Sequence, residues 1–107
     1  MANEQFLAQL WATIESRKAD AGPEKSYTRE LLANPSMARK KVAEEAHEVN
    51  EAHQALLAGQ DTKDHLAHEA ADLIYHLFVV LASADVTPAE VYAVLQGRHG
   101  KKTRAGT

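Results

Sequence analysis

Five acidic side chains in two short blocks are the residues of this sequence best suited to chemistry. The first block contains Glu44, Glu45 and Glu48, and the second contains Glu69 and Asp72. On an α-helix, residues three or four positions apart share a face, so within each block neighbouring carboxylates repel one another. A hard divalent cation relieves this repulsion, because Mg²⁺ takes oxygen ligands and keeps coordination positions for water and phosphate. The two blocks therefore indicate a Mg²⁺ site, in which Mn²⁺ can substitute.

A solvated helix face is the main alternative for the first block. Glutamate-rich helices are commonly exposed, and two lysines lie four residues before the first two glutamates, where they can form surface ion pairs. The first block alone leaves the two interpretations equally open. The second block favours a site, because Asp72 runs directly into the apolar stretch 73–81. We expect that stretch to be buried, and an acid beside it needs a partner.

Helices must position these blocks, and the hydrophobic pattern predicts an all-α chain. No segment alternates with the period of two that is typical of a half-buried strand. Four helices are predicted: an apolar stripe from Phe6 to Ile14 that ends before residues 21–23, a helix from Asn34 and Pro35 to Gly59, a third after Thr62, and a fourth from Thr87 to Gly97 or Gly100. Residues 26–32 are predicted to form a loop that leads into a short helical turn.

The two acidic blocks fall on the second and third predicted helices, which a short link around Gly59 joins. Such a link favours an antiparallel helical hairpin. Each block lies about a dozen residues from the turn, so at a rise of ~1.5 Å per residue the blocks sit at roughly the same height. The sequence thus predicts that the five acids meet across the hairpin.

Composition limits the class of protein. The chain has 107 residues, no cysteine and a formal net charge of −3. We expect one domain over residues 1–97 and a basic, mobile tail over residues 98–107. The lack of cysteine excludes disulfides, zinc–thiolate sites and cysteine nucleophiles. Because the acids are bunched, we expect no nucleic-acid partner.

Location and assembly follow from the apolar segments. The N-terminal residues show no basic region followed by a long apolar one, and the stretch 73–81 is too short to span a bilayer. We therefore expect a cytoplasmic protein with no membrane partner. A chain of this size gains buried apolar surface by association, so we also predict a homodimer.

Three strings of residues give the chain a family resemblance. They are Lys41-Val42-Ala43-Glu44-Glu45-x-x-Glu48, Glu69-Ala70-Ala71-Asp72-Leu73-Ile74-Tyr75-His76-Leu77, and Ser26-Tyr27-Thr28 with Leu31-Leu32. From about Ser26 to Leu95 the sequence closely resembles the phosphoribosyl-ATP pyrophosphatase family, one of the all-α, MazG-like nucleotide pyrophosphohydrolases. It departs from the family at Ala43, where many relatives have glycine, and in the tail, which lacks the family's usual final motif.

The resemblance implies Mg²⁺-dependent hydrolysis of the nucleotide substrate phosphoribosyl-ATP to phosphoribosyl-AMP and pyrophosphate, the second step of histidine biosynthesis. It also implies a four-helix bundle that homodimerisation completes. Glu45 or Glu48 would accept the proton of the attacking water. Carried over residue by residue, the resemblance makes five acids the metal-site candidates: Glu44, Glu45, Glu48, Glu69 and Asp72.

Cations and hydroxyl groups near the acidic blocks are candidates for holding substrate phosphates. We favour Lys41 and Arg29, which flank the strings named above, together with the hydroxyls of Ser26 and Thr28. Helix-capping or turn-forming roles are an equal alternative for these two hydroxyls. The chain contains no His-Glu-x-x-His motif, so a zinc hydrolase is not supported. We expect His76 at a helix contact with its ring hydrogen-bonded.

Two other functions stay open at this point. The first keeps the chemistry but acts on other nucleoside triphosphates, either standard or damaged. The second is a non-catalytic helical interaction module, whose acids are solvated and bind no metal. A panel of triphosphates tested beside phosphoribosyl-ATP addresses the first alternative, and a metal titration addresses the second.

Overall fold

A computed structural model describes residues 2–19 and 26–99, and within these two ranges it contains helices and no β-strand. The helices are α1 Ala2–Ala19, α2 Tyr27–Leu32, α3 Pro35–Leu57, α4 Lys63–Ser83 and α5 Pro88–His99. The predicted all-α class is confirmed. The short helix α2 occupies the segment predicted as a loop and a helical turn. The predicted break at residues 21–23 lies outside the described residues.

Side-chain caps start α3, α4 and α5 where the sequence predicted. Asn34 and Thr62 each accept a hydrogen bond from the backbone amide three residues later, at 3.3 and 3.1 Å. At α5, Thr87 and Glu90 each bond the other's backbone amide in a capping box. Because the first amides of a helix have no partner within it, these polar residues fix where the three helices begin.

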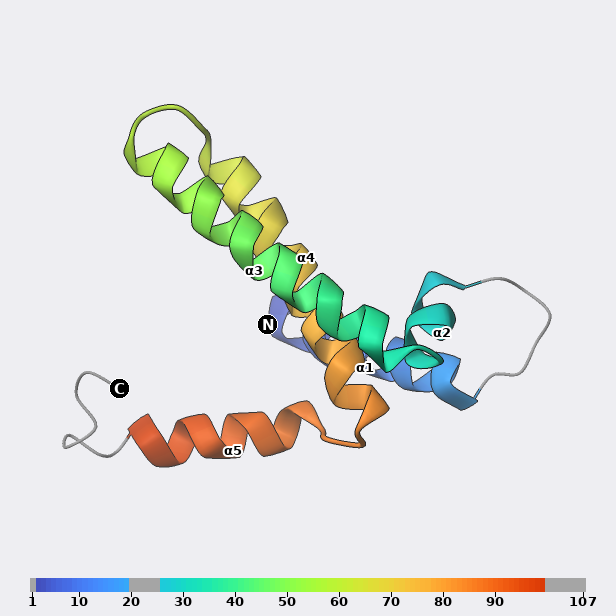
Figure 1. The fold of residues 1–107 in the computed structure, drawn as a ribbon. Coiled ribbons are helices and arrows are strands. Elements are labelled where there is room, and N and C mark those ends of the chain that lie inside the picture. The colour runs from blue at the N-terminus through green and yellow to red at the C-terminus, as the bar shows by residue number, and fades with distance from the viewer. Residues whose placement is uncertain (1, 20–25, 100–107) are drawn as a thin grey trace.

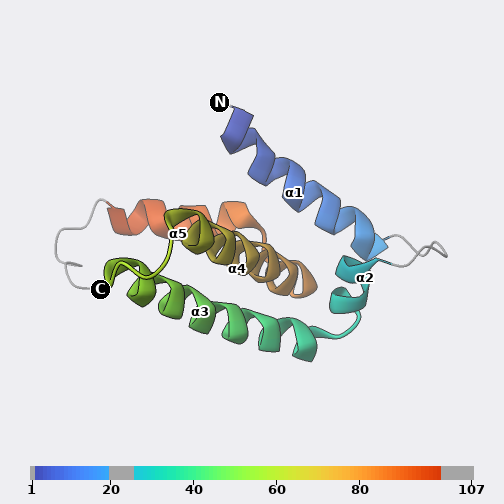
Figure 2. The ribbon, with the colours of Figure 1, turned by 90° about the horizontal axis from the view of Figure 1, so that it is seen from above.

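The helices α3 and α4 run side by side as an antiparallel hairpin (Figures 1 and 2). The turn between them contains Gly59, whose φ of +77° lies in the left-handed region that glycine adopts without strain. The other side of α4 packs against α1, so α4 lies between α3 and α1 (Figure 2). The predicted hairpin of the two acidic helices is confirmed.

A small apolar core lies where α1, α2, α3 and α4 meet. Its buried members are Ile14, Leu31, Ala38, Phe78, Val79 and Ala82. Trp11 packs on this cluster and meets Phe78 edge to face, with the ring centroids 5.8 Å apart. Burial of one large apolar side chain contributes about 1.5–3 kcal/mol, so this core holds α1 and α2 against the hairpin.

A lysine of α1 closes the C-terminal end of α4. Nζ of Lys18 donates to the carbonyl of Ala82 at 2.8 Å and also contacts the carboxylate of Asp85. Asp85 follows the helix with a φ of +60°, a conformation that Asp tolerates better than most residues. A cation here suits the negative end of the α4 dipole. This contact anchors α1 to α4 at a second point beside the core.

The last helix, α5, projects away from the hairpin and contributes only Pro88 to the buried residues (Figure 1). It continues through Gly97 and ends at His99. Arg98 and His99 are therefore helical, in agreement with the later of the two predicted helix ends. The rest of the predicted tail, residues 100–107, lies outside the described residues.

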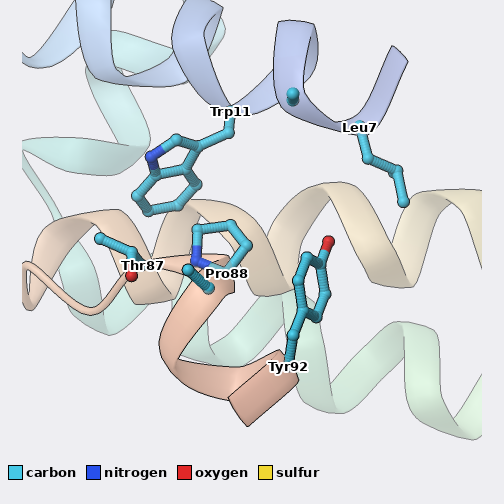
Figure 3. Close-up of a pocket in the computed structure, with 7 residues that line it drawn as sticks. Leu7, Trp11, Thr87, Pro88 and Tyr92 are labelled. Atoms are coloured by element: carbon cyan, nitrogen blue, oxygen red, sulfur yellow. The ribbon is translucent and has the colours of Figure 1, made fainter. Parts of the chain in front are cut away.

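An apolar groove separates α1 from α5 on one side of α4. It contains two hollows of about 300 and 200 Å³. Figure 3 shows Trp11 and Leu7 of α1 on one side and Pro88 and Tyr92 of α5 on the other. Ile74 and Leu77 of α4 line the smaller hollow, and their side chains are exposed. The stretch 73–81, which the sequence predicted to be buried, is thus only partly covered within a single chain.

By length and hydropathy alone, α4 would also qualify as a membrane-spanning helix. A core helix passes the same test, and α4 packs against α1, α2 and α3. It also carries Glu69, Asp72 and His76, which are costly to place in hydrocarbon. These contacts and polar side chains favour a core helix.

Candidate active site

The buried centre of the hairpin is a contact between the first acidic block and α4. Glu45 is 9% exposed and His76 is 6% exposed. Oε1 of Glu45 lies 2.5 Å from Nδ1 of His76. Asp72, which the sequence placed beside the buried segment, is exposed instead. Among the five acids of the two blocks, Glu45 is therefore the most buried.

Nδ1 of His76 faces two acceptors, a backbone carbonyl of α4 and the carboxylate of Glu45. Nδ1 bonds the carbonyl of Asp72, one helical turn earlier, at 3.0 Å. Because a carbonyl can only accept, Nδ1 carries the proton. Despite its short distance from Nδ1, Oε1 of Glu45 makes no hydrogen bond of acceptable geometry with any described residue. A buried carboxylate oxygen in this state is costly, so it favours a donor or a cation nearby.

Two tyrosines join this centre to α2. The hydroxyl of Tyr27 lies 2.8 Å from Nε2 of His76, and the hydroxyl of Tyr75 is hydrogen-bonded to Thr28. The two tyrosine rings lie nearly parallel, with centroids 6.3 Å apart. The Tyr27 hydroxyl is therefore the partner of Nε2, the ring nitrogen that faces α2. The string Ser26-Tyr27-Thr28 is thereby tied to α4 through its side chains.

The electrostatics of Glu45 show that acids of both blocks lie near one another. Burial raises the pKa of Glu45 above its usual value, and the His76 ring opposes that rise. Repulsion from the carboxylates of Asp72 and Glu48 raises the pKa further. Burial likewise raises the pKa of the Tyr27 phenol. Glu45, Glu48 and Asp72 thus form one electrostatic group across the hairpin.

The remaining two acids of the blocks have other partners. Glu44 pairs with Lys41 at 3.5 Å, at a spacing of three residues and not the spacing of four that the solvated-face alternative expects. Glu69 lies 3.2 Å from Nε2 of His65, whose Nδ1 lies 2.6 Å from Asp61. In the part of the chain that the structure describes, no three His, Cys, Asp or Glu side chains are arranged to hold a metal ion. The five acids therefore share the hairpin without converging on one point.

A divalent cation nevertheless fits the chemistry of these side chains. The available donors are carboxylate oxygens, which Mg²⁺ and Mn²⁺ prefer. One of them, Oε1 of Glu45, is buried and has no well-formed hydrogen bond within residues 2–19 and 26–99. Glu48 and Asp72 have exposed side chains that can change rotamer without disturbing the core. Glu45, Glu48 and Asp72 would hold the ion, and Glu44 and Glu69 could join them by leaving their present partners.

Several of the residues predicted to bind phosphate also have structural roles. Ser26 caps α2 by accepting a hydrogen bond from the amide of Arg29 at 3.2 Å, and Thr28 bonds Tyr75. The capping alternative is thus realised for Ser26. Lys41 borders a cavity of about 340 Å³ between α2 and the start of α3, whose wall consists of Tyr27, Glu30, Leu31, Asn34, Met37 and Lys41. Phosphate binding by Lys41, Arg29, Ser26 and Thr28 stays a prediction.

Sequence reasoning missed Tyr27 as a partner in this site. Its neighbours Ser26 and Thr28 were predicted to bind phosphate because hydroxyl groups can donate to phosphate oxygens. A tyrosine at this position gives no comparable signal in the sequence. The contact between Tyr27 and His76 joins positions 49 residues apart, which no local pattern reveals. For His76, the expected helix contact with a hydrogen-bonded ring is confirmed.

Comparison with known proteins gives one consistent family. The sequence model described as phosphoribosyl-ATP pyrophosphohydrolase matches residues 7–99. A phosphoribosyl-ATP pyrophosphatase of Cereibacter sphaeroides is 46% identical over 95 residues, which cover 88% of this chain and 86% of that protein. Proteins of the same name from Dinoroseobacter shibae and Caulobacter sp. are 44% and 42% identical, over 88% and 90% of this chain and 87% and 84% of their own lengths. The matched range includes both acidic blocks and the Tyr27 segment.

Proposed function

This chain belongs to the phosphoribosyl-ATP pyrophosphohydrolase family, and we propose that its reaction uses Mg²⁺ held by carboxylates of α3 and α4. The protein is an enzyme of histidine biosynthesis that hydrolyses phosphoribosyl-ATP to phosphoribosyl-AMP and pyrophosphate. The bond that breaks is a phosphoric anhydride. The single observation that supports the metal is the buried Oε1 of Glu45, which makes no well-formed hydrogen bond with any described residue.

Glu45, Glu48 and Asp72, with Glu44 and Glu69, would hold the ion. When bound, it would supply positive charge to the phosphate oxygens and lower the pKa of a bound water. Glu45 is our preferred acceptor for the proton of the attacking water, because it is buried beside His76 and burial raises the pKa of its carboxyl group. Glu48 is the alternative acceptor.

Substrate binding is proposed to extend from the acids toward α2. Lys41 lies between Glu44 and the cavity of about 340 Å³, and so can neutralise a phosphate at that edge. Arg29, Ser26 and Thr28 are further phosphate contacts from α2 and its cap. The volume of the cavity falls in the range of about 300–1,000 Å³ typical of small-molecule sites. It leaves space for part of the nucleotide beside the Tyr27 ring.

Pyrophosphate release from phosphoribosyl-ATP tests this proposal. We expect turnover with Mg²⁺ or Mn²⁺ and none in excess chelator, with activity restored when the metal is added back. Full turnover in chelator would refute the metal proposal. Faster turnover of an ordinary or damaged nucleoside triphosphate than of phosphoribosyl-ATP would favour the broader MazG-like activity.

We also propose that a second copy of this chain covers the apolar groove and completes a four-helix bundle. Leu7, Ile74, Leu77 and Tyr92 are exposed on three helices that line one groove. Monomers rarely leave such a contiguous patch to water, and a chain of 107 residues gains buried surface by pairing. As a family member in amino-acid biosynthesis, the dimer would act in the cytoplasm.

Light scattering tests the dimer. We expect twice the chain mass at micromolar concentration, and we expect Leu77→Glu to shift the protein toward the monomer. Leu57→Glu is the matched control, since Leu57 is 75% exposed at the hairpin turn. A parental monomer whose melting temperature does not depend on concentration would contradict the proposal.

A further inference from the structure

The His76 ring is held at both of its nitrogen atoms. Nδ1 bonds the carbonyl of Asp72 at 3.0 Å, and Nε2 lies 2.8 Å from the hydroxyl of Tyr27. The Tyr27 ring stands edge-on to the imidazole, with centroids 5.7 Å apart and an interplanar angle of 88°. Two polar partners from different helices therefore define the rotation of this ring within the core.

The fixed ring forms one wall against the Glu45 carboxylate. Oε1 of Glu45 lies 2.5 Å from Nδ1, and both residues are almost completely buried. A bond to the backbone of α4 alone would link His76 only to its own helix. The hydroxyl of Tyr27 adds a restraint from α2, so the position of α2 bears on the carboxylate of α3 through the imidazole.

We propose that Tyr27 and His76 are positioning residues for Glu45: the Tyr27 hydroxyl locks the His76 ring, and the ring sets the orientation of the Glu45 carboxylate in the hydrolytic site. This inference rests on the proposed function, in which Glu45 acts on the attacking water or the ion. Outer partners of this kind are commonly worth about 10–100-fold in activity or metal affinity.

His76 is not placed to contact substrate directly, since α2, α3 and α4 enclose its ring. Tyr27 has two sides with different roles. Its ring borders the cavity of about 340 Å³, whereas its hydroxyl is bonded to His76. Removal of the hydroxyl alone should therefore lower kcat and leave KM unchanged, because the cavity wall is retained.

The test compares Tyr27→Phe with Tyr75→Phe. The two tyrosine rings are stacked side by side, and each change removes the hydroxyl of one of them. The Tyr75 hydroxyl, however, bonds Thr28 and not His76. We expect Tyr27→Phe to lower kcat for phosphoribosyl-ATP by about 10-fold or more, at unchanged KM. Tyr75→Phe should lower kcat much less, although the two variants lose similar thermal stability.

Replacement of His76 provides a second test. Asparagine places an amide donor near the position of Nδ1, whereas glutamine reaches toward the position of Nε2. His76→Asn should keep more activity than His76→Gln, because it retains the donor beside Glu45. In the His76→Asn background, Tyr27→Phe should cause no further loss of kcat, since its partner is already absent.

A spectroscopic measurement separates positioning from general loss of structure. In protein labelled with ¹⁵N-histidine, Tyr27→Phe should shift the Nε2 resonance of His76, and Tyr75→Phe should leave it in place. Equal kcat losses in the two tyrosine variants, or a raised KM at normal kcat for Tyr27→Phe, would overturn the positioning role alone. A parent enzyme that releases no pyrophosphate would overturn the proposed function, and this inference with it.

Discussion

The α3–α4 hairpin contains two contacts between histidine and carboxylate that differ in their exposure to water. Near the core, His76 lies against Glu45, and both side chains are buried. Near the turn, His65 lies between Asp61 and Glu69 with about half of its side chain exposed. The inner contact joins two helices, whereas the outer contact links residues four positions apart along the chain.

The same pairing chemistry has opposite electrostatic results at the two places. At the outer contact, the hydrogen bond from His65 lowers the pKa of Asp61, as expected when the charged form is favoured. At the inner contact, burial raises the pKa of Glu45 although His76 is close. Desolvation outweighs the partner in the interior, which leaves Glu45 in need of a further positive charge. The outer pair has no such deficit.

The largest difference between the two contacts is expected in activity. Glu45→Gln should lower kcat by about 10²–10⁴-fold, the usual worth of a positioned proton acceptor, as measured by pyrophosphate release. Asp61→Asn should retain close to parental kcat. Because the buried charge of Glu45 is unfavourable in the metal-free protein, Glu45→Gln should be at least as stable as the parent.

Both parts of this comparison can fail. Comparable kcat losses in Glu45→Gln and Asp61→Asn would mean that burial does not distinguish the acids. A Glu45→Gln variant that is inactive because it is unfolded would show that the carboxylate is structural. Circular dichroism and thermal melting of each variant decide between these outcomes.

Stability should separate the two histidines. His76→Ala removes a buried ring with two hydrogen-bonded nitrogens, so we expect a loss of about 2–4 kcal/mol in the free energy of unfolding. His65→Ala should fall within the small range typical of exposed substitutions. Urea unfolding measures both, and an equal m-value for parent and variants is the check that the unfolding transition is comparable. Equal losses would contradict the contrast in burial.

Much of the fold was readable from local chemistry. Asn34, Thr62 and the Thr87–Glu90 box mark helix starts because a cap acts within one turn, and Gly59 marks the hairpin turn for the same local reason. The short helix α2 was harder to predict, since a helix of six residues is stabilised chiefly by its packing on the core. The end of α5 was left open between Gly97 and Gly100 because glycine is tolerated inside a helix at modest cost, and the helix continues to His99.

The sequence predicted which residue types form the candidate site, but it did not predict which of these residues are buried. Spacing indicated which acids share a helix face, yet the rotation of α3 and α4 about their axes decides which one enters the core. That rotation follows from the packing of Phe78, Val79 and Ala82 against other helices. Glu45 is buried as a consequence, and Asp72 is exposed. The contact between Tyr27 and His76 depends on the same long-range packing.

Metal binding should distinguish an acid of the inner group from an outer acid. An ion that binds only the native state adds RT ln(1 + [L]/Kd), which is roughly 2.7 kcal/mol at a hundredfold excess over Kd. We expect Mg²⁺ to raise the melting temperature of the parent and of Asp64→Asn alike, at constant ionic strength. Glu48→Gln should lose most of that gain and also its activity. Equal Mg²⁺ shifts in all three proteins would return the acids to the solvated-face interpretation.

The smallest expected effect concerns the outer contact itself. Asp61→Asn removes the charge beside His65 but leaves an oxygen that can still accept the bond from the Thr62 amide, which is 2.7 Å in the parent. The melting temperature should therefore fall slightly at low ionic strength, because the ion pair that is lost is partly exposed to solvent. In about 1 M salt, where the screening length is about 3 Å, the difference should vanish. Thermal melting of parent and Asp61→Asn in matched buffers measures it. A difference that persists in high salt would mean that the outer contact, like the inner one, is shielded from solvent.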